Sequence, residues 1–186
     1  MSAVGPSARP APGLAGRDRL FVLPAALLAA GLAASAQRRA AETLIAGGVA
    51  AVVVVLAAVD VRHRIIPNRI VLPATALVLL ARGALLPGDA LGFALAAGVA
   101  GMALLILNLL ARGGVGMGDV KFALLIGATV GTHAVAAISL GFFAIFPVAL
   151  VVLIRKGLSG RRAWLPLGPF LALGTLVVLM MPGTVG

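Results

Sequence analysis

Long apolar runs separated by short basic segments dominate this sequence. Of its 186 residues, 62% are hydrophobic and only 11% are charged, and the mean hydropathy is +1.18. A soluble domain of this size cannot bury so much apolar surface, so the chain is expected to lie in a membrane. The runs are continuous rather than alternating, which argues against an outer-membrane β-barrel. The sequence therefore predicts an all-α fold, a polytopic membrane helical bundle.

Seven apolar runs are expected to form helices. The first, residues 20–36, follows a basic tail (1–19) that we expect to be disordered, and it fits either a signal anchor or a cleavable secretory signal. The run from Asp119 to about Gly131 would be roughly 20 Å long as a helix, short of the ~30 Å hydrocarbon core. We therefore expect it to be a half-depth or buried helix. The other helices are expected at 43–59, 67–86, 90–111, 134–154 and 164–181, with a short tail at 182–186.

The basic residues predict the orientation of the bundle. The formal net charge is +10, but the charges lie in short loops between apolar runs, which indicates topology and contact with anionic lipid rather than nucleic-acid binding. With a cytoplasmic N-terminus, all Lys and Arg residues except Arg38, Arg39 and Arg82 fall on the cytoplasmic side. The positive-inside rule favours this arrangement. We expect a multi-pass protein of the inner (plasma) membrane, with the lipid bilayer as its surroundings and no nucleic-acid partner.

Two acids interrupt the apolar pattern. Asp60 closes the run 43–59, and Asp119 follows a glycine-rich turn and begins the short run. An ionisable side chain costs roughly 2.5–3.5 kcal/mol at the centre of a bilayer, and less near its edge. The predicted topology places both acids at the cytoplasmic face, although they are far apart in the sequence. We therefore expect them to form a pair.

A pair of carboxyls can hydrolyse a peptide without metal or covalent intermediate. Two close carboxyls do not both ionise easily, so one is protonated while the other is charged. The charged member accepts a proton from water and the neutral one donates to the peptide carbonyl. Helix dipoles suggest that Asp119, at a helix N-terminus, is the base, and that Asp60, near a helix C-terminus, is the acid.

For the residues near the two acids, the sequence allows a structural explanation as well as a functional one. The glycines of the turn are expected to permit positive φ and close approach of a substrate strand, although glycines alone also fit a flexible loop. They are Gly113, Gly114, Gly116 and Gly118. Lys121 either extends toward lipid headgroups or neutralises charge near the pair. His63 has no partner ligand, and the chain has no cysteine, so we expect no metal and no cofactor.

Three motifs resemble those of the prepilin peptidase family, the GxGD-type aspartic proteases of type IV pilus and type II protein secretion systems. They occur in the family's order with apolar sequence between them, which makes the resemblance specific over about residues 43–181. The motifs are Gly116-Met117-Gly118-Asp119-Val120-Lys121, Asp60 followed by Ile66-Pro67-Asn68, and Pro166-Leu167-Gly168-Pro169-Phe170.

The resemblance implies a six-helix membrane core at 43–181 plus one N-terminal span. It implies that Asp60 and Asp119 are the catalytic pair of an aspartic-type endopeptidase. The substrate would be a prepilin-like precursor, cut at the cytoplasmic face after its short basic leader. The family's bifunctional members carry a cysteine-containing insert that this chain lacks, so methyltransferase activity is not expected. The remaining motif residues would bind substrate or support the site: Gly116, Gly118, Lys121, Pro67, Asn68, Gly168 and Pro169.

Two functions of other classes are alternatives to the protease. A small transporter or proton carrier could relay protons through the two aspartates, but a relay usually strings ionisable groups across the bilayer. The second is a non-catalytic assembly subunit of a pilus or secretion apparatus.

Overall fold

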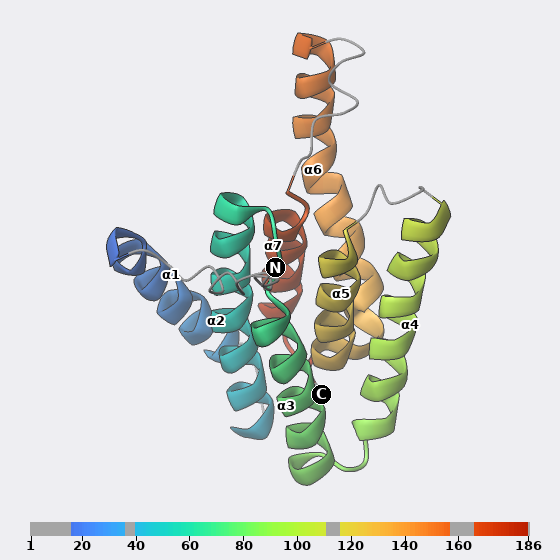
Figure 1. Ribbon diagram of the computed structural model, residues 1–186. Coiled ribbons are helices and arrows are strands. Elements are labelled where there is room, and N and C mark those ends of the chain that lie inside the picture. The colour runs from blue at the N-terminus through green and yellow to red at the C-terminus, as the bar shows by residue number, and fades with distance from the viewer. Residues whose placement is uncertain (1–15, 36–39, 111–115, 157–165, 186) are drawn as a thin grey trace, which may run out of the picture.

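The computed structural model describes residues 16–35, 40–110, 116–156 and 166–185 (Figure 1). The described residues are helical, without a strand, which confirms the predicted all-α bundle. The elements are α1 (Gly16–Ser35), α2 (Ala40–His63), α3 (Asn68–Leu85), α4 (Ala90–Leu110), α5 (Met117–Val130), the 3-10 turn η1 (Gly131–His133), α6 (Ala134–Lys156) and α7 (Gly168–Leu179).

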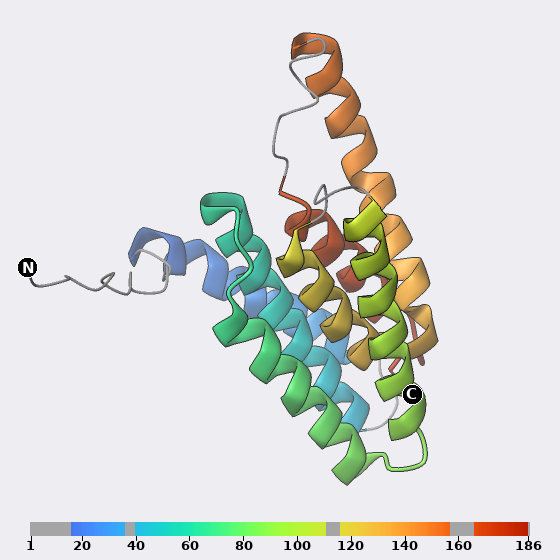
Figure 2. The same ribbon diagram turned by 45° about the vertical axis from the view of Figure 1, so that its right-hand side comes forward.

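Four helical stretches of the described chain are long and apolar enough to cross a membrane. They are α2, α3, α4 and the stretch Met117–Val152, which comprises α5, η1 and most of α6. Figure 2 shows that the C-terminal part of α6 extends well past the ends of α2 and α5.

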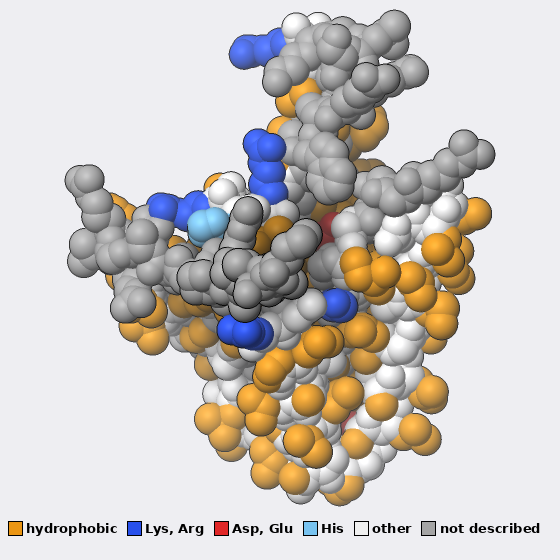
Figure 3. Space-filling model, in the orientation of Figure 1, with side chains coloured by type: hydrophobic (Ala, Val, Ile, Leu, Met, Phe, Trp, Pro, Cys, Tyr) orange, Lys and Arg blue, Asp and Glu red, His pale blue; other side chains and the backbone are white. Residues whose placement is uncertain are grey.

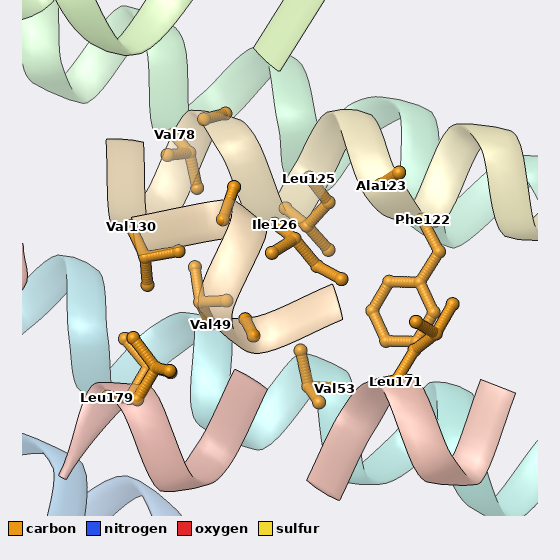
Figure 4. Close-up of a cluster of buried hydrophobic side chains, with 14 of the residues drawn as sticks. Val49, Val53, Val78, Phe122, Ala123, Leu125, Ile126, Val130, Leu171 and Leu179 are labelled. Carbon is orange, nitrogen blue, oxygen red and sulfur yellow. The ribbon is translucent and has the colours of Figure 1, made fainter. Parts of the chain in front are cut away.

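Helix α5 forms the centre of the bundle. It packs most extensively against α4 and also contacts α3, α6 and α7. Its side chains Phe122, Leu125 and Ile126 are fully buried, and they meet Val53 of α2 and Leu171 of α7 in the apolar core (Figure 4). The short run that begins at Asp119 is thus a buried helix, as its length predicts.

Close helix packing around α5 depends on glycine. A Cβ on Gly127 would lie 2.5 Å from the Ala96 carbonyl oxygen and 2.6 Å from the Ala97 Cα, both in the backbone of α4. A backbone cannot move aside as a side chain can, so α4 and α5 approach this closely only with glycine at this position.

Several helix boundaries differ from those expected from sequence. The first helix begins at Gly16, so the expected disordered tail is wrong for residues 16–19, while residues 1–15 lie outside the described chain. Helix α3 begins at Asn68, with Pro67 immediately before it rather than in its first turn. Pro67 has extended backbone angles (φ −70°, ψ 121°).

The last helix is shorter than the expected span 164–181. Helix α7 has 12 residues, about 18 Å in length, which does not cross the ~30 Å hydrocarbon core. Pro169 lies in its first turn, where the absent N–H has no helical partner in any case. Beyond Leu179 the chain turns through Gly183, which has φ +78°.

The residues after this turn are part of the core. Thr184 and Val185 are buried, although the sequence indicated only a short tail at 182–186. The Thr184 hydroxyl donates to the Val178 carbonyl at 3.0 Å, so this segment folds back onto the end of α7.

Candidate active site

The two aspartates lie at the same end of the bundle. Asp60 is in the last turn of α2, and Asp119 is in the first turn of α5. Asp60 is buried, with 5% of its surface exposed, and Asp119 is partly buried. The two carboxyl groups are close enough to interact electrostatically. The fold thus brings together two acids that lie in separate motifs.

The backbone of α7 fixes the Asp60 carboxyl. The N–H of Gly168, the first residue of α7, donates to Asp60 Oδ2 at 3.0 Å. A Cβ at position 168 would lie 2.6 Å from that oxygen and 3.0 Å from Cγ. Only glycine allows the amide to reach the carboxylate here, because a Cβ atom would occupy the space of the carboxyl group.

Asp119 is fixed by its own helix. Its Oδ2 accepts the N–H of Gly116 at 3.1 Å, so it caps the first turn of α5 from the third helical position. This is the acidic half of a capping box, in which a side chain satisfies an N–H that the helix leaves free. Among the described residues, hydrogen bonds engage only Oδ2 of Asp119 and of Asp60. Oδ1 of each carboxyl remains for other partners.

Gly118 allows α5 to approach the segment between α2 and α3. A Cβ on Gly118 would lie 3.0 Å from the Cβ of Ile66, which is buried. The explanation by positive φ is wrong for the described glycines of this motif: Gly116 has φ −70°, and Gly118 lies within α5. Close packing is the reason for glycine. The other two glycines of the turn, Gly113 and Gly114, lie outside the described residues.

A side-chain hydrogen bond joins the two motifs that carry the acids. The Lys121 Nζ donates to Asn68 Oδ1 at 2.8 Å, which links the first turns of α5 and α3. From the sequence, Lys121 is expected either to extend toward lipid headgroups or to neutralise charge near the aspartates. In the structure its ammonium group instead binds a side chain of α3.

The sequence pattern of the Type IV leader peptidase family matches residues 47–155, more than half of the chain. The chain belongs to this family. Membership makes it a membrane peptidase and agrees with the resemblance drawn from the motifs. The match includes Asp60 and Asp119 and ends before the third motif, Pro166 to Phe170. None of the curated proteins and none of the solved structures matches the chain.

The helix-dipole argument for different roles of the two aspartates is wrong in this leader peptidase family member. Asp60 does lie near the C-terminus of α2, but its carboxyl group accepts a hydrogen bond from the N-terminus of α7. Asp119 lies at the N-terminus of α5. Both carboxyls therefore face a helix N-terminus, and the dipoles favour the anion at each. The short helix α7 removes the asymmetry that the sequence suggested.

Basic side chains surround the site of the peptidase. Figure 3 shows Lys and Arg side chains gathered in the upper part of the molecule, while the lower part is covered by apolar side chains. His63 lies at this end too, and no group of three potential metal ligands occurs in the described part of the chain. Among the residues whose burial is described, the exposed arginines at this end are Arg62, Arg64, Arg69 and Arg155.

The path of the peptidase chain between α2 and α3 includes one unusual residue. Helix α2 ends at His63, and Arg64 has φ +53°, in the left-handed region that terminates helices. The chain then passes Ile66 and Pro67 to enter α3 beside α5. No residue type in the sequence marks this turn, because arginine does not favour left-handed backbone.

Proposed function

We propose that this chain is an aspartic endopeptidase that removes the leader of prepilin-like precursors, with Asp60 and Asp119 as its catalytic pair. The observation that carries the proposal is that two helices in contact, α2 and α5, place their carboxyls at the same end of a membrane bundle, near enough to interact electrostatically. Family membership supplies the class of reaction.

The pair carries out general acid–base hydrolysis of a peptide bond. The two carboxyls share one proton, because like charges in a common site disfavour double ionisation. The ionised member accepts a proton from water, whose oxygen attacks the peptide carbonyl carbon, and the protonated member donates to the carbonyl oxygen. Collapse of the tetrahedral intermediate transfers a proton to the leaving nitrogen as the C–N bond breaks. The backbone N–H groups of Gly168 and Gly116 orient the carboxyls through Oδ2, so Oδ1 of each faces this chemistry.

The position of the pair suits a substrate that is itself anchored in the membrane. Both acids lie at the ends of their helices, near the level where exposed arginines gather. The positive-inside rule makes this the cytoplasmic face of the plasma membrane. A precursor with an apolar helix in the bilayer would present the residues just before that helix at the same level. The exposed arginines serve topology and anionic lipid contact rather than binding of a basic leader.

The test is co-expression of the full chain with a candidate prepilin whose apolar helix follows a glycine. We expect the wild type to shorten the precursor, and Asp60→Asn and Asp119→Asn each to abolish the shift in mobility. Loss of a general acid or base costs about 10²–10⁴-fold in rate. Asparagine keeps the shape of the side chain, so membrane insertion and protein level should be unchanged.

Thr175→Val is the matched control. This buried residue of α7 hydrogen-bonds only within its own helix in the described chain, through its hydroxyl to the Leu171 carbonyl at 2.7 Å. Its replacement by an apolar residue of similar shape should leave cleavage intact. Cleavage by either Asp→Asn variant at the wild-type rate would overturn the proposal.

A further inference from the structure

Helix α5 ends inside the bundle, and its last carbonyl groups need partners. An α-helix leaves the last four of its C=O groups without an intrahelical donor. At the end of α5 the Gly131 N–H bonds to the Gly127 carbonyl, but the carbonyls of Ala128 and Thr129 lie beyond that bond. These residues are buried, and a buried carbonyl without a donor is costly.

Arg82 of α3 supplies these partners. It is fully buried, its Nε donates to the Ala128 carbonyl at 2.8 Å, and one terminal nitrogen donates to the Thr129 carbonyl. The other terminal nitrogen donates to the Val185 carbonyl at 3.0 Å. The guanidinium also lies 3.1 Å from the centre of the Phe93 ring of α4. All three of its nitrogens are thus used, and the arginine connects α3, α4, α5 and the C-terminal segment.

The charge of Arg82 is balanced at this end of the bundle. It interacts electrostatically with Asp89 and Glu42, and Glu42 is itself buried. In the topology predicted from the sequence, Arg82 is only one of three basic residues on the non-cytoplasmic side. A buried arginine with three carbonyl partners has a more specific role, because a desolvated guanidinium is costly unless its donors are paired.

The same helix, α3, contacts α5 at the other end through Asn68 and Lys121. On α3, the contact residues Asn68 and Arg82 lie about 21 Å apart along the helix axis, and on α5 Lys121 and Ala128 lie about 10 Å apart. The long Lys and Arg side chains cover the difference. The two contacts therefore hold α5 to α3 near each of its ends, and a slide along its axis would disturb both of them.

We propose that Arg82 is a positioning residue for Asp119. By binding the C-terminal carbonyls of α5, with the Asn68–Lys121 contact at the other end, it fixes the position of α5 along its axis and hence the level of Asp119 relative to Asp60. The inference rests on the proposed catalytic role of Asp119. Misplacement of a catalytic group by about 1 Å can cost about 10²-fold in rate, so this control of position has a functional consequence.

The test combines kinetics with a reporter of the position of α5. The chain has no cysteine, so Met117→Cys, at the half-exposed first residue of α5, introduces a single thiol for maleimide labelling. Arg82→Met removes the hydrogen-bond donors and puts an unbranched apolar side chain in their place. We expect it to lower kcat by at least about tenfold with little change in KM, and to change the labelling rate at position 117. Arg82→Lys should be intermediate in both, because one ammonium cannot reproduce the fork of donors.

Val78→Ala is the structural control. Val78 is a buried residue one turn before Arg82 on α3, and its truncation destabilises the core but leaves the donors to the Ala128 and Thr129 carbonyls in place. It should leave kcat per folded molecule and labelling unchanged. If Arg82→Met affects kcat and labelling no more than Val78→Ala does, the inference is wrong.

Asn68→Ala keeps the inference testable if Arg82→Met does not fold. Asn68 is exposed, so this variant removes the hydrogen bond between Lys121 and Asn68 without leaving a buried cavity. It should lower kcat and shift labelling in the same sense as Arg82→Lys, and wild-type values for both variants would overturn the inference. Failure of the proposed function looks different: Asp119→Asn would then cleave normally, whatever the labelling shows.

Discussion

The two ends of α5 are bound by side chains of opposite charge. At its N-terminus an acid, Asp119, accepts the backbone N–H of Gly116, and at its C-terminus a cation, Arg82, donates to the carbonyls of Ala128 and Thr129. Each charge complements the helix dipole where it lies. The difference is in what remains unused. Every nitrogen of Arg82 is engaged, whereas each aspartate has one oxygen without a hydrogen bond in the described chain. We infer that the acidic end serves chemistry and that the arginine end supports it indirectly, by holding α5 in position.

The largest contrast is expected from the acids themselves. If Asp60 and Asp119 act as one unit, the double variant Asp60→Asn/Asp119→Asn should be no less active than either single variant, each about 10²–10⁴-fold below wild type. Single-turnover cleavage of a prepilin measures this. Independent, multiplying losses would show that the two residues do not share a step.

A smaller effect is expected at the amide that orients Asp60. Gly168→Ala places a Cβ where the Asp60 carboxyl lies, so the carboxyl must move and activity should fall by about 10–100-fold. Unfolding should become easier by about 1–3 kcal/mol, as for other overpacked sites. The measurements are cleavage rate and thermal unfolding in detergent.

Gly98→Ala controls for the chemistry of the substitution. Gly98 lies in α4 with nothing within 4 Å of an added Cβ, so alanine should leave activity unchanged and stabilise the helix by up to about 1 kcal/mol. Equal activity of Gly168→Ala and Gly98→Ala would show that the hydrogen bond from the Gly168 amide to Asp60 does not contribute to catalysis.

Gly118→Ala should have an intermediate effect. Its added Cβ would lie 3.0 Å from the Ile66 Cβ, a contact that a shift of a few tenths of an ångström relieves. We expect a several-fold loss of activity, smaller than for Gly168→Ala, because α5 rather than the carboxyl itself is displaced. A larger loss at Gly118 than at Gly168 would contradict the geometry of the site.

The smallest effect is expected in the segment after α7, at Thr184. Thr184→Val removes a buried hydroxyl that donates to the Val178 carbonyl, which should cost about 0.5–1.5 kcal/mol of unfolding free energy. The melting temperature should fall by roughly 2–4 °C per kcal/mol, with activity per folded molecule unchanged. A selective loss of activity would contradict a purely structural role for Thr184.

The sequence predicts the parts of this fold that depend on local pattern. Continuous apolar runs indicate the helices, and the short run after Asp119 indicates a buried helix because it cannot span the bilayer. The placement of Asp60 and Asp119 at one end follows from counting spans between basic loops.

The missed features depend on packing between distant segments. Nothing near Asp60 in the sequence shows that the N–H of Gly168 reaches it, and this contact removes the expected difference between the acids. The role of Arg82 had one signal, a lone arginine in an apolar run, where a charge requires a partner. Its partners, the end carbonyls of α5 and of Val185, are backbone atoms that no sequence motif marks.

Crosslinking tests the central claim, that the two acids meet in one site, most directly. In a chain without cysteine, Asp60→Cys and Asp119→Cys together introduce one pair of thiols, which a short bifunctional thiol reagent can join. The pair Asn68→Cys with Lys121→Cys is the positive control, because these side chains are in contact, and Asp60→Cys with Asp89→Cys is the negative control. Efficient joining of positions 60 and 119 is the predicted result. Joining at 68 and 121 but not at 60 and 119 would contradict it.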